Sequence, residues 1–128
     1  MSGILFLCIH NAGRSQMAAG FARELSHGTV NILSGGSEPA DQVNPIAVEV
    51  MREIGIDIAG YTPQRFTDEL LHSVDVVVTM GCGDTCPFIP GKTYVDWPLD
   101  DPKGRPLEEV RRIRDEIRAR VEDLLAQL

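Results

Sequence analysis

Two kinds of hydrophobic pattern alternate along the chain: short apolar runs, and longer stretches in which apolar residues recur at helical spacing. The apolar runs predict four strands, at residues 4–8, 29–34, 74–79 and 92–96. Apolar positions three and four residues apart predict helices over residues 14–25, 45–54 and 106–128, with a short helical turn opening at residues 67–69. Because strands that alternate with helices form right-handed crossovers, we expect an α/β fold: a single three-layer domain spanning residues 1–128, with a four-stranded parallel sheet and helices on both faces.

Polar residues, prolines and glycines mark where these elements begin and end. Asn44 followed by Pro45 predicts a helix start, because asparagine caps free N–H groups and proline suits the first helical position. Gly28 and Gly55 predict helix ends, whereas the stretch GGSEP at residues 35–39 predicts a loop. The apolar positions expected to be buried are Ile46, Ala47, Val50, Met51 and Ile54 in the second helix, and Leu107, Val110, Ile113, Ile117, Val121, Leu124 and Leu128 in the last.

The composition is that of a soluble globular protein. Of the 128 residues, 43% are hydrophobic and 24% are charged. The net charge of −7 argues against nucleic acid and anionic membranes as partners, because both attract basic surfaces. The longest apolar run, from Ile4 to Ile9, is too short to span a bilayer, and no basic residue precedes it. We therefore expect a cytoplasmic protein, in which the three cysteines are more often catalytic, redox-active or metal-binding than structural.

The segment from Cys8 to Ser15, CIHNAGRS, carries the strongest chemical signal. Cys8 ends a predicted buried strand and Arg14 opens the next helix, so the loop between them can direct N–H groups inward beside the positive end of that helix. Such a loop suits a tetrahedral oxyanion, and the Arg14 guanidinium can hold two of its oxygens. The same groups favour a thiolate at Cys8, although a half-buried cysteine beside a surface arginine is the plainer alternative. The residues expected to bind the oxyanion are Ile9, His10, Asn11, Ala12, Gly13, Arg14 and Ser15, with His10 contributing its backbone.

Two further cysteines, Cys82 and Cys86, follow the third predicted strand. The carboxyl ends of parallel strands meet at one edge of a sheet, and Cys8 should lie at that edge as well. Thiols close to a reactive thiolate suggest a disulfide relay. Their spacing also fits half of a zinc site, although the sequence offers no second pair of ligands, and two inert loop cysteines are a further alternative.

A candidate general acid follows the fourth predicted strand, in the loop Asp100-Asp101-Pro102. This loop should reach the same edge of the sheet. A carboxylic acid that supplies a proton eases the departure of an oxygen from a tetrahedral centre. Asp101, which the following proline restrains, is therefore the candidate, although the same tripeptide is by itself a common turn.

Taken together, these segments resemble the arsenate reductases that share the low-molecular-weight tyrosine phosphatase fold. The resemblance spans nearly the whole chain and rests on Cys8 to Ser15 with Gln16-Met17-Ala18, Asn44-Pro45, Val77-Val78-Thr79, the paired cysteines, and Trp97 through Asp101-Pro102. It implies that Cys8 is the nucleophile and Asp101 the general acid. Arg14 and Ser15 would then support the turn and the thiolate.

The reaction that this resemblance implies is the reduction of arsenate to arsenite, with no bound cofactor. Cys8 attacks arsenate while Asp101 protonates the departing oxygen. Cys82 then attacks Cys8 and releases arsenite. Cys86 resolves the Cys8–Cys82 disulfide, and thioredoxin reduces the Cys82–Cys86 disulfide that results.

The chain departs from the family pattern at two places. Three residues separate Cys82 from Cys86, fewer than in the thioredoxin-coupled members, so that a small thiol such as mycothiol or a glutaredoxin-like partner could replace part of the relay. Ala19 stands where potassium-binding members have a glutamate, and we therefore predict no metal.

Two other functions fit parts of the pattern. A low-molecular-weight protein tyrosine phosphatase would use Cys8 and Arg14 in the same way, but it would not need the paired cysteines. Such phosphatases also carry an aromatic residue soon after the Asp-Pro pair, where this chain has Lys103. A non-catalytic thiol protein could bind a metal or arsenite through three cysteines, but it would have no use for Arg14.

Overall fold

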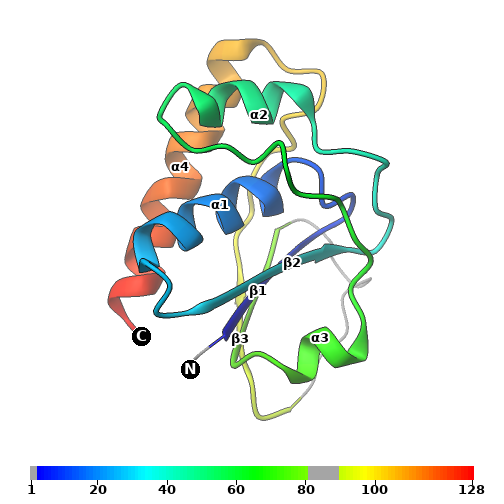
Figure 1. Cartoon of the computed structure of the whole chain (residues 1–128), viewed down its shortest axis with the longest axis vertical. Helices are drawn as coiled ribbons and strands as arrows, with labels where there is room; N and C mark the ends of the chain where they lie inside the picture. The colour runs from blue at the N-terminus through cyan, green and yellow to red at the C-terminus, as the bar shows by residue number, and fades with distance from the viewer. Residues whose placement is uncertain (1–2, 81–89) are drawn as a thin grey trace.

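The computed structural model describes residues 3–80 and 90–128. In these residues a parallel sheet of four strands forms the centre, with the spatial order β2-β1-β3-β4 (Figure 1). The strands are β1 (Gly3–Cys8), β2 (Asn31–Gly36), β3 (Val76–Thr79) and β4 (Thr93–Asp96). The predicted parallel sheet is confirmed, and each strand lies within two residues of its expected position.

Helices cover the two faces of the sheet unequally. They are α1 (Arg14–Ser26), α2 (Pro45–Arg52), α3 (Asp68–His72) and α4 (Leu107–Ala126). The helices α1, α2 and α4 lie together on one face, and the short α3 lies on the other (Figure 1). The three-layer α/β architecture is therefore as predicted. In this part of the chain, no helix combines the length and the apolar composition that crossing a membrane requires.

Strand β1 is apolar along its whole length because both of its faces are buried. Phe6 points into the larger core, where its ring centroid lies 6.0 Å from that of Trp97. Leu5 and Leu7 point to the opposite face and pack with Leu71 of α3. Since side chains alternate along a strand, a central strand between two helical layers leaves no position for a polar residue.

Two residues predicted to be buried lie at the surface. Ile46 is 37% exposed in the first turn of α2, and Leu128 is 53% exposed beyond the end of α4. Both residues follow the spacing of the apolar positions in their helices. Each lies at a helix end, however, where the core that covers the middle turns no longer reaches.

Asn44 caps α2 as predicted, with its Oδ1 accepting a hydrogen bond from the Ile46 N–H at 2.9 Å. The helix ends at Arg52, earlier than expected, although Ile54 still packs against the core.

The prediction of a loop over residues 35–39 is wrong for its first two residues, because both glycines belong to β2. Gly36 pairs with Cys8 across the sheet and forms a bridge to Arg65 on its other side. A Cβ atom at Gly36 would lie 2.5 Å from the carbonyl oxygen of Ile9. The glycine is therefore required by the close approach of the chain after β1 to the end of β2, and not by a turn.

Ion pairs join the end of α2 to α4. Glu53 accepts hydrogen bonds from Arg111 at 2.6 Å and from Arg114 at 2.9 Å. Arg114 is buried among the apolar residues of α4, and it also donates to the carbonyl oxygen of Val50 at 2.9 Å. These acceptors offset the cost of burying its charge.

Replacing Gly36 by alanine is expected to lower the free energy of unfolding by about 1–3 kcal/mol, the usual cost of forcing extra atoms into a packed site. The added methyl group would collide with the Ile9 carbonyl, which is backbone and cannot move without shifting the chain after Cys8. Gly60→Ala is the matched control, because a Cβ atom there meets nothing within 4 Å. Urea unfolding measures both variants, and equal stabilities would contradict the close approach.

The Glu53 pairing predicts a pH-dependent contribution to stability. The hydrogen bond from Arg111, followed by the other interactions with Arg111 and Arg114, holds the pKa of Glu53 below its ordinary value of 4.5. Because the pKa is lowered in the folded protein, the stabilisation is complete above that ordinary value and is lost as the pH falls through the folded-state pKa. Urea unfolding should therefore find the wild type more stable than Glu53→Gln at neutral pH, with the difference shrinking in acid. A difference that is independent of pH would argue against the pairing.

Candidate active site

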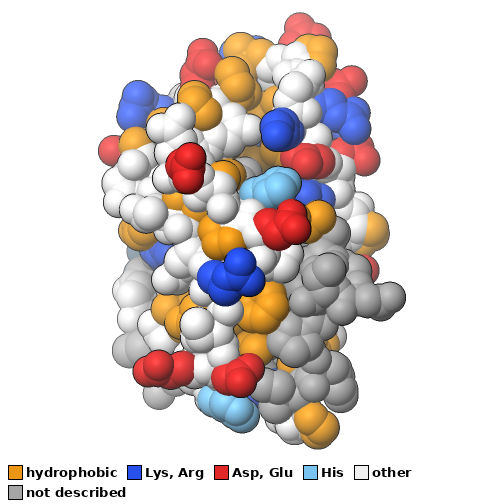
Figure 2. Space-filling model, turned by 90° about the vertical axis from the view of Figure 1, so that its right-hand side faces the viewer, with side chains coloured by type: hydrophobic (Ala, Val, Ile, Leu, Met, Phe, Trp, Pro, Cys, Tyr) orange, Lys and Arg blue, Asp and Glu red, His pale blue; other side chains and the backbone are white. Residues whose placement is uncertain are grey.

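The candidate site lies at the carboxyl edge of the sheet, in the turn of residues 9–13 between β1 and α1. The carboxyl ends of β1 and β2 point to the right-hand side of Figure 1, and Figure 2 views the molecule from that side, where charged side chains of both signs are scattered. Asn11 has a left-handed backbone with φ 50°, a conformation that asparagine tolerates better than most residues. Arg14 begins α1 directly after Gly13. The expected succession of buried strand, turn and helix is therefore present.

Cys8 lies at the base of this turn and is 2% exposed. Its Sγ accepts a hydrogen bond from the backbone N–H of Asn11 at 3.2 Å. The Oγ of Ser15 lies 2.8 Å from the same sulfur and accepts a hydrogen bond from Asn11 Nδ2 at 2.7 Å. Because that amide donates to the Ser15 oxygen, the single hydroxyl hydrogen of Ser15 is available to Cys8. Two groups that can donate a hydrogen bond therefore lie against one sulfur.

The backbone of the turn directs its carbonyl groups outward, to the segment of residues 38–44. These hydrogen bonds run from Glu38 N–H to Ile9 O at 2.8 Å, from Ala40 N–H to His10 O at 3.0 Å and from Asn44 N–H to Ala12 O at 2.8 Å. The N–H of a trans peptide points opposite to its carbonyl, and the described residues contain no cis peptide. The N–H groups of His10, Asn11 and Gly13 therefore face away from that segment, on the inner side of the turn, where they can hold the oxygens of an anion.

Two glutamines that the sequence pattern did not single out hold Asn11 in place. The Nε2 of Gln16 donates to the Asn11 carbonyl at 3.0 Å and to its Oδ1 at 3.2 Å. The backbone N–H of Gln64 donates to the same Oδ1 at 3.0 Å, and its side chain donates to the carbonyl of Ser34 at 2.8 Å. Gln16 could have been noticed as a polar residue next to the buried Met17, whereas Gln64 lies 53 residues from Asn11 and carries no local signal.

Arg14 and Asp101 lie side by side at the site. Arg14 is 7% exposed, and its Nη1 donates to the carbonyl oxygen of Leu99 at 3.1 Å. Its Nη2 lies 3.9 Å from Oδ2 of Asp101, whose side chain is 51% exposed. The Leu99 contact fixes the plane of the guanidinium, so that the edge formed by Nε and Nη2 can hold two oxygens of an anion. The structure thus brings the predicted arginine and the predicted acid together, although they are far apart in the sequence.

Cys82 and Cys86 lie outside the described residues, and the proposed relay and the zinc half-site lie there with them. Cys8 is a free thiol. In residues 3–80 and 90–128, no group of three or more His, Cys, Asp or Glu side chains is placed to hold a metal ion.

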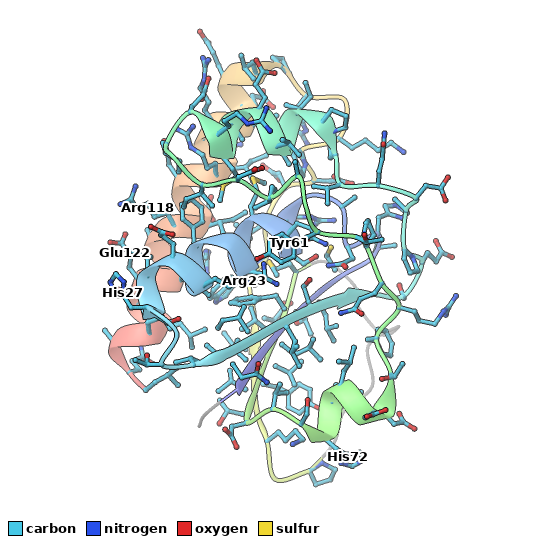
Figure 3. The ribbon with its side chains drawn as sticks, viewed as in Figure 1. Arg23, His27, Tyr61, His72, Arg118 and Glu122 are labelled. Carbon is cyan, nitrogen blue, oxygen red and sulfur yellow. The ribbon has the colours of Figure 1, made fainter. Side chains whose placement is uncertain are left out.

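The histidines do not gather at Cys8. His27 lies at the C-cap of α1 and His72 is the last residue of α3, both away from the turn (Figure 3). His10 belongs to the turn, but its ring Nδ1 lies 3.0 Å from the carbonyl oxygen of Glu38. That ring is therefore engaged in the link between the turn and the segment that follows β2.

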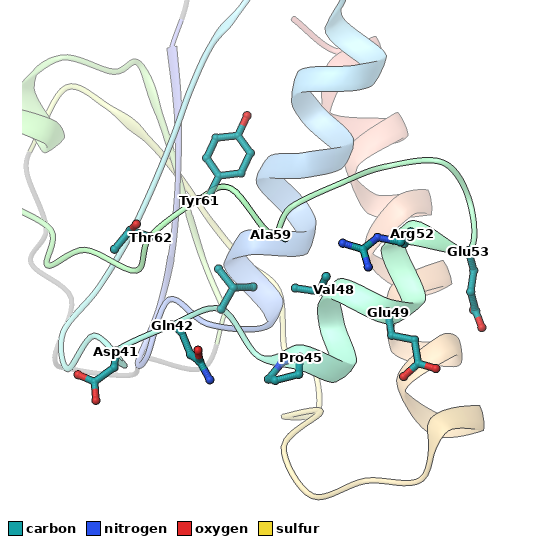
Figure 4. Close-up of a pocket in the computed structure, with 11 residues that line it drawn as sticks. Asp41, Gln42, Pro45, Val48, Glu49, Arg52, Glu53, Ala59, Tyr61 and Thr62 are labelled. Atoms are coloured by element: carbon teal, nitrogen blue, oxygen red, sulfur yellow. The ribbon is translucent and has the colours of Figure 1, made fainter.

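Two hollows lie near these elements. A cavity of about 750 Å³ beside α2 is lined by residues that include Val48 and Tyr61, and by no residue of the turn (Figure 4). A groove of about 370 Å³ adjoins the turn, with His10 on one side and Lys103 among its other lining residues. Of these two hollows, the groove is the one lined by residues of both the turn and the loop after Asp101.

Comparison with known proteins agrees with this geometry. Residues 3–128 match the family described as low molecular weight phosphotyrosine protein phosphatase. An arsenate reductase 2 of Staphylococcus epidermidis is 42% identical over 123 residues, which cover 93% of this chain and 92% of that protein. A glutaredoxin arsenate reductase of Synechocystis sp. is 38% identical, with 100% of this chain and 99% of that protein covered.

A solved structure also has a similar fold. The thioredoxin-dependent arsenate reductase of Corynebacterium glutamicum superposes with a TM-score of 0.89 at 38% identity, and the match covers 99% of this chain. It covers 61% of the Corynebacterium chain, so this chain spans less than two thirds of that protein's length. With a family match over residues 3–128 and relatives of this similarity, the chain belongs to the low molecular weight phosphotyrosine protein phosphatase family and, within it, to the arsenate reductases.

Proposed function

We propose that this chain reduces arsenate to arsenite, with Cys8 as the nucleophile and with Cys82 and Cys86 as an intramolecular disulfide relay. The observation that carries the proposal is the setting of Cys8, a buried sulfur that accepts hydrogen bonds at the base of a turn whose N–H groups face inward. The names of the relatives support arsenate as the anion that this turn receives.

The first step is the attack of the Cys8 thiolate on the arsenic atom. The inward N–H groups and Arg14 hold the remaining arsenate oxygens and balance their charge. Asp101 gives a proton to the departing oxygen, which leaves as water. Sulfur has then replaced one oxygen, and the arsenic is still As(V).

Reduction takes place when the Cys82 thiolate attacks the sulfur of Cys8. A sulfur–sulfur bond forms, the sulfur–arsenic bond breaks, and its electron pair stays on the arsenic, which leaves as arsenite. Cys86 then attacks Cys82, which frees Cys8 as a thiolate and leaves a Cys82–Cys86 disulfide. Two thiols have thereby supplied the two electrons that As(V) takes up.

An external dithiol of the thioredoxin type resets the relay in this proposal. The burial of Cys8, which is 2% exposed, disfavours direct attack on it by a thiol carried on another protein. A relay that moves the oxidised pair away from Cys8 solves this problem. One relative is described as thioredoxin-dependent and another as a glutaredoxin arsenate reductase, so a glutaredoxin-like protein or a small thiol such as mycothiol is the alternative. The chemistry needs no bound cofactor, because thiols supply the electrons.

Arsenite formation from arsenate tests the relay. With thioredoxin, thioredoxin reductase and NADPH, the purified protein should turn over. Cys8→Ser, Cys82→Ser and Cys86→Ser should each abolish turnover, because each removes one sulfur that the cycle requires. If Cys8→Ser alone is inactive, an external thiol does the work of the relay. Phosphoester cleavage without arsenate reduction by any thiol system would replace the proposal with a phosphatase.

The role of Asp101 is tested by Asp101→Asn, which keeps the side-chain shape but cannot give up a proton. We expect the first adduct to form about 10²- to 10⁴-fold more slowly, the usual contribution of a positioned acid. Asp100→Asn is the matched control, since Asp100 pairs with Arg112 of α4 at 3.2 Å. Rapid mixing with arsenate in the absence of reductant follows the loss of free thiol in a single turnover. Equal rates in the two variants would show that Asp101 is not the acid.

A further inference from the structure

Gln16 is a buried polar side chain in the first turn of α1, directly before a run of buried apolar residues. It is 1% exposed, between Ser15 and the buried Met17. Its Nε2 donates to both oxygens of Asn11, at 3.0 Å to the carbonyl and at 3.2 Å to Oδ1. Neither contact touches Cys8 or the space for an anion, so the proposed reaction does not by itself assign a role to this residue.

The hydrogen bonds that reach Asn11 determine which way its amide faces. Oδ1 accepts from Gln16 Nε2 and from the backbone N–H of Gln64, at 3.2 and 3.0 Å. With the oxygen held on that side, Nδ2 must face Ser15 Oγ, which lies 2.7 Å away. The Ser15 oxygen then acts as an acceptor, which leaves its hydrogen available for the sulfur of Cys8, 2.8 Å away.

We propose that Gln16 is a positioning residue for the nucleophile: together with the Gln64 N–H, it holds the Asn11 amide in one orientation and so keeps the Ser15 hydroxyl available to Cys8. This inference rests on the proposed role of Cys8 as the attacking thiolate. Gln64 makes its contact through the backbone, so Gln16 is the described side chain through which this orientation can be changed by substitution.

The amide oxygen of Gln16 indicates that this residue positions Asn11 rather than stabilises the folded protein. Its Oε1 is buried and has no hydrogen-bond partner among the described residues. A buried acceptor without a partner destabilises the folded protein. Gln16→Met removes this unpaired oxygen together with the two donated hydrogen bonds, at nearly constant side-chain size, so its net effect on unfolding should be small.

The test measures the reactivity of Cys8 without arsenate. In the full chain carrying Cys82→Ser and Cys86→Ser, Cys8 is the remaining thiol, and its alkylation by iodoacetamide is followed across the pH range. We expect Gln16→Met to move the midpoint of the rate profile upward, with about tenfold slower alkylation on its acid side, because a hydrogen bond to the charged sulfur is weakened. The two profiles should meet at high pH, where Cys8 is a thiolate in both proteins.

Two further variants separate positioning from general loosening of the fold. Gln16→Glu keeps the size of the side chain but replaces the donating amide nitrogen by a carboxylate oxygen, so it too should raise the midpoint, and it serves if Gln16→Met does not fold. Ser26→Ala is the control, because Ser26 is another buried polar residue of α1, and its hydroxyl donates within its own last turn to Arg23. It should leave the midpoint where it is.

An unchanged midpoint in both Gln16 variants, or an equal shift in Ser26→Ala, would overturn the inference. An upward shift confined to the Gln16 variants would support it. Arsenite formation is assayed separately on the chain with all three cysteines. A protein that forms no arsenite but shows the Gln16-specific shift would contradict the proposed function and leave the positioning of the thiol intact.

Discussion

The site depends on the outward hydrogen bonds of the turn between β1 and α1. A peptide group has its N–H and its carbonyl on opposite sides, so three carbonyls bound by the segment of residues 38–44 force their partner N–H groups to the inner side. Asn44 takes part twice, because its backbone donates to the Ala12 carbonyl while its side chain caps α2. The start of α2 and the shape of the turn are thereby parts of one arrangement.

Close approach of the backbone is the second condition for this arrangement. The chain after β1 passes so near the end of β2 that Gly36 has no room for a side chain against the Ile9 carbonyl. That proximity lets the residues following β2 reach the carbonyls of the turn. On the other side of β2, Gly36 also exchanges hydrogen bonds with the segment that carries Gln64, whose N–H reaches Asn11. The sheet edge and the anion turn are therefore built together.

Burial of Cys8 follows from the same packing and has a chemical consequence. A sulfur that is 2% exposed keeps the N–H of Asn11 and the hydroxyl of Ser15 free from competition with water. The same burial limits which thiols can approach it. In the proposed relay, Cys82 and Cys86 supply thiols from the same chain, which avoids the approach of an external thiol to the buried sulfur.

Local patterns were sufficient for the order and type of the elements and for the position of the turn between β1 and α1. The apolar run of β1, the Asn44 cap and the segment from Cys8 to Ser15 can each be interpreted within a few residues, because side-chain period and capping are local properties. The expectation that the Asp101 loop reaches the same edge as Cys8 could be made because parallel strands place their carboxyl ends at one edge, and Asp101 lies there beside Arg14.

Only the tertiary structure decided how tightly these parts fit. It placed Gly36 in a strand rather than in a loop, and it left Ile46 exposed at the end of its helix. The bond from Gln64 to Asn11 spans 53 residues, and the bond from Arg14 to Leu99 spans 85. The sequence by itself determined which groups could do the chemistry. Their orientation depends on distances between segments remote in the chain, which no local pattern of residues encodes.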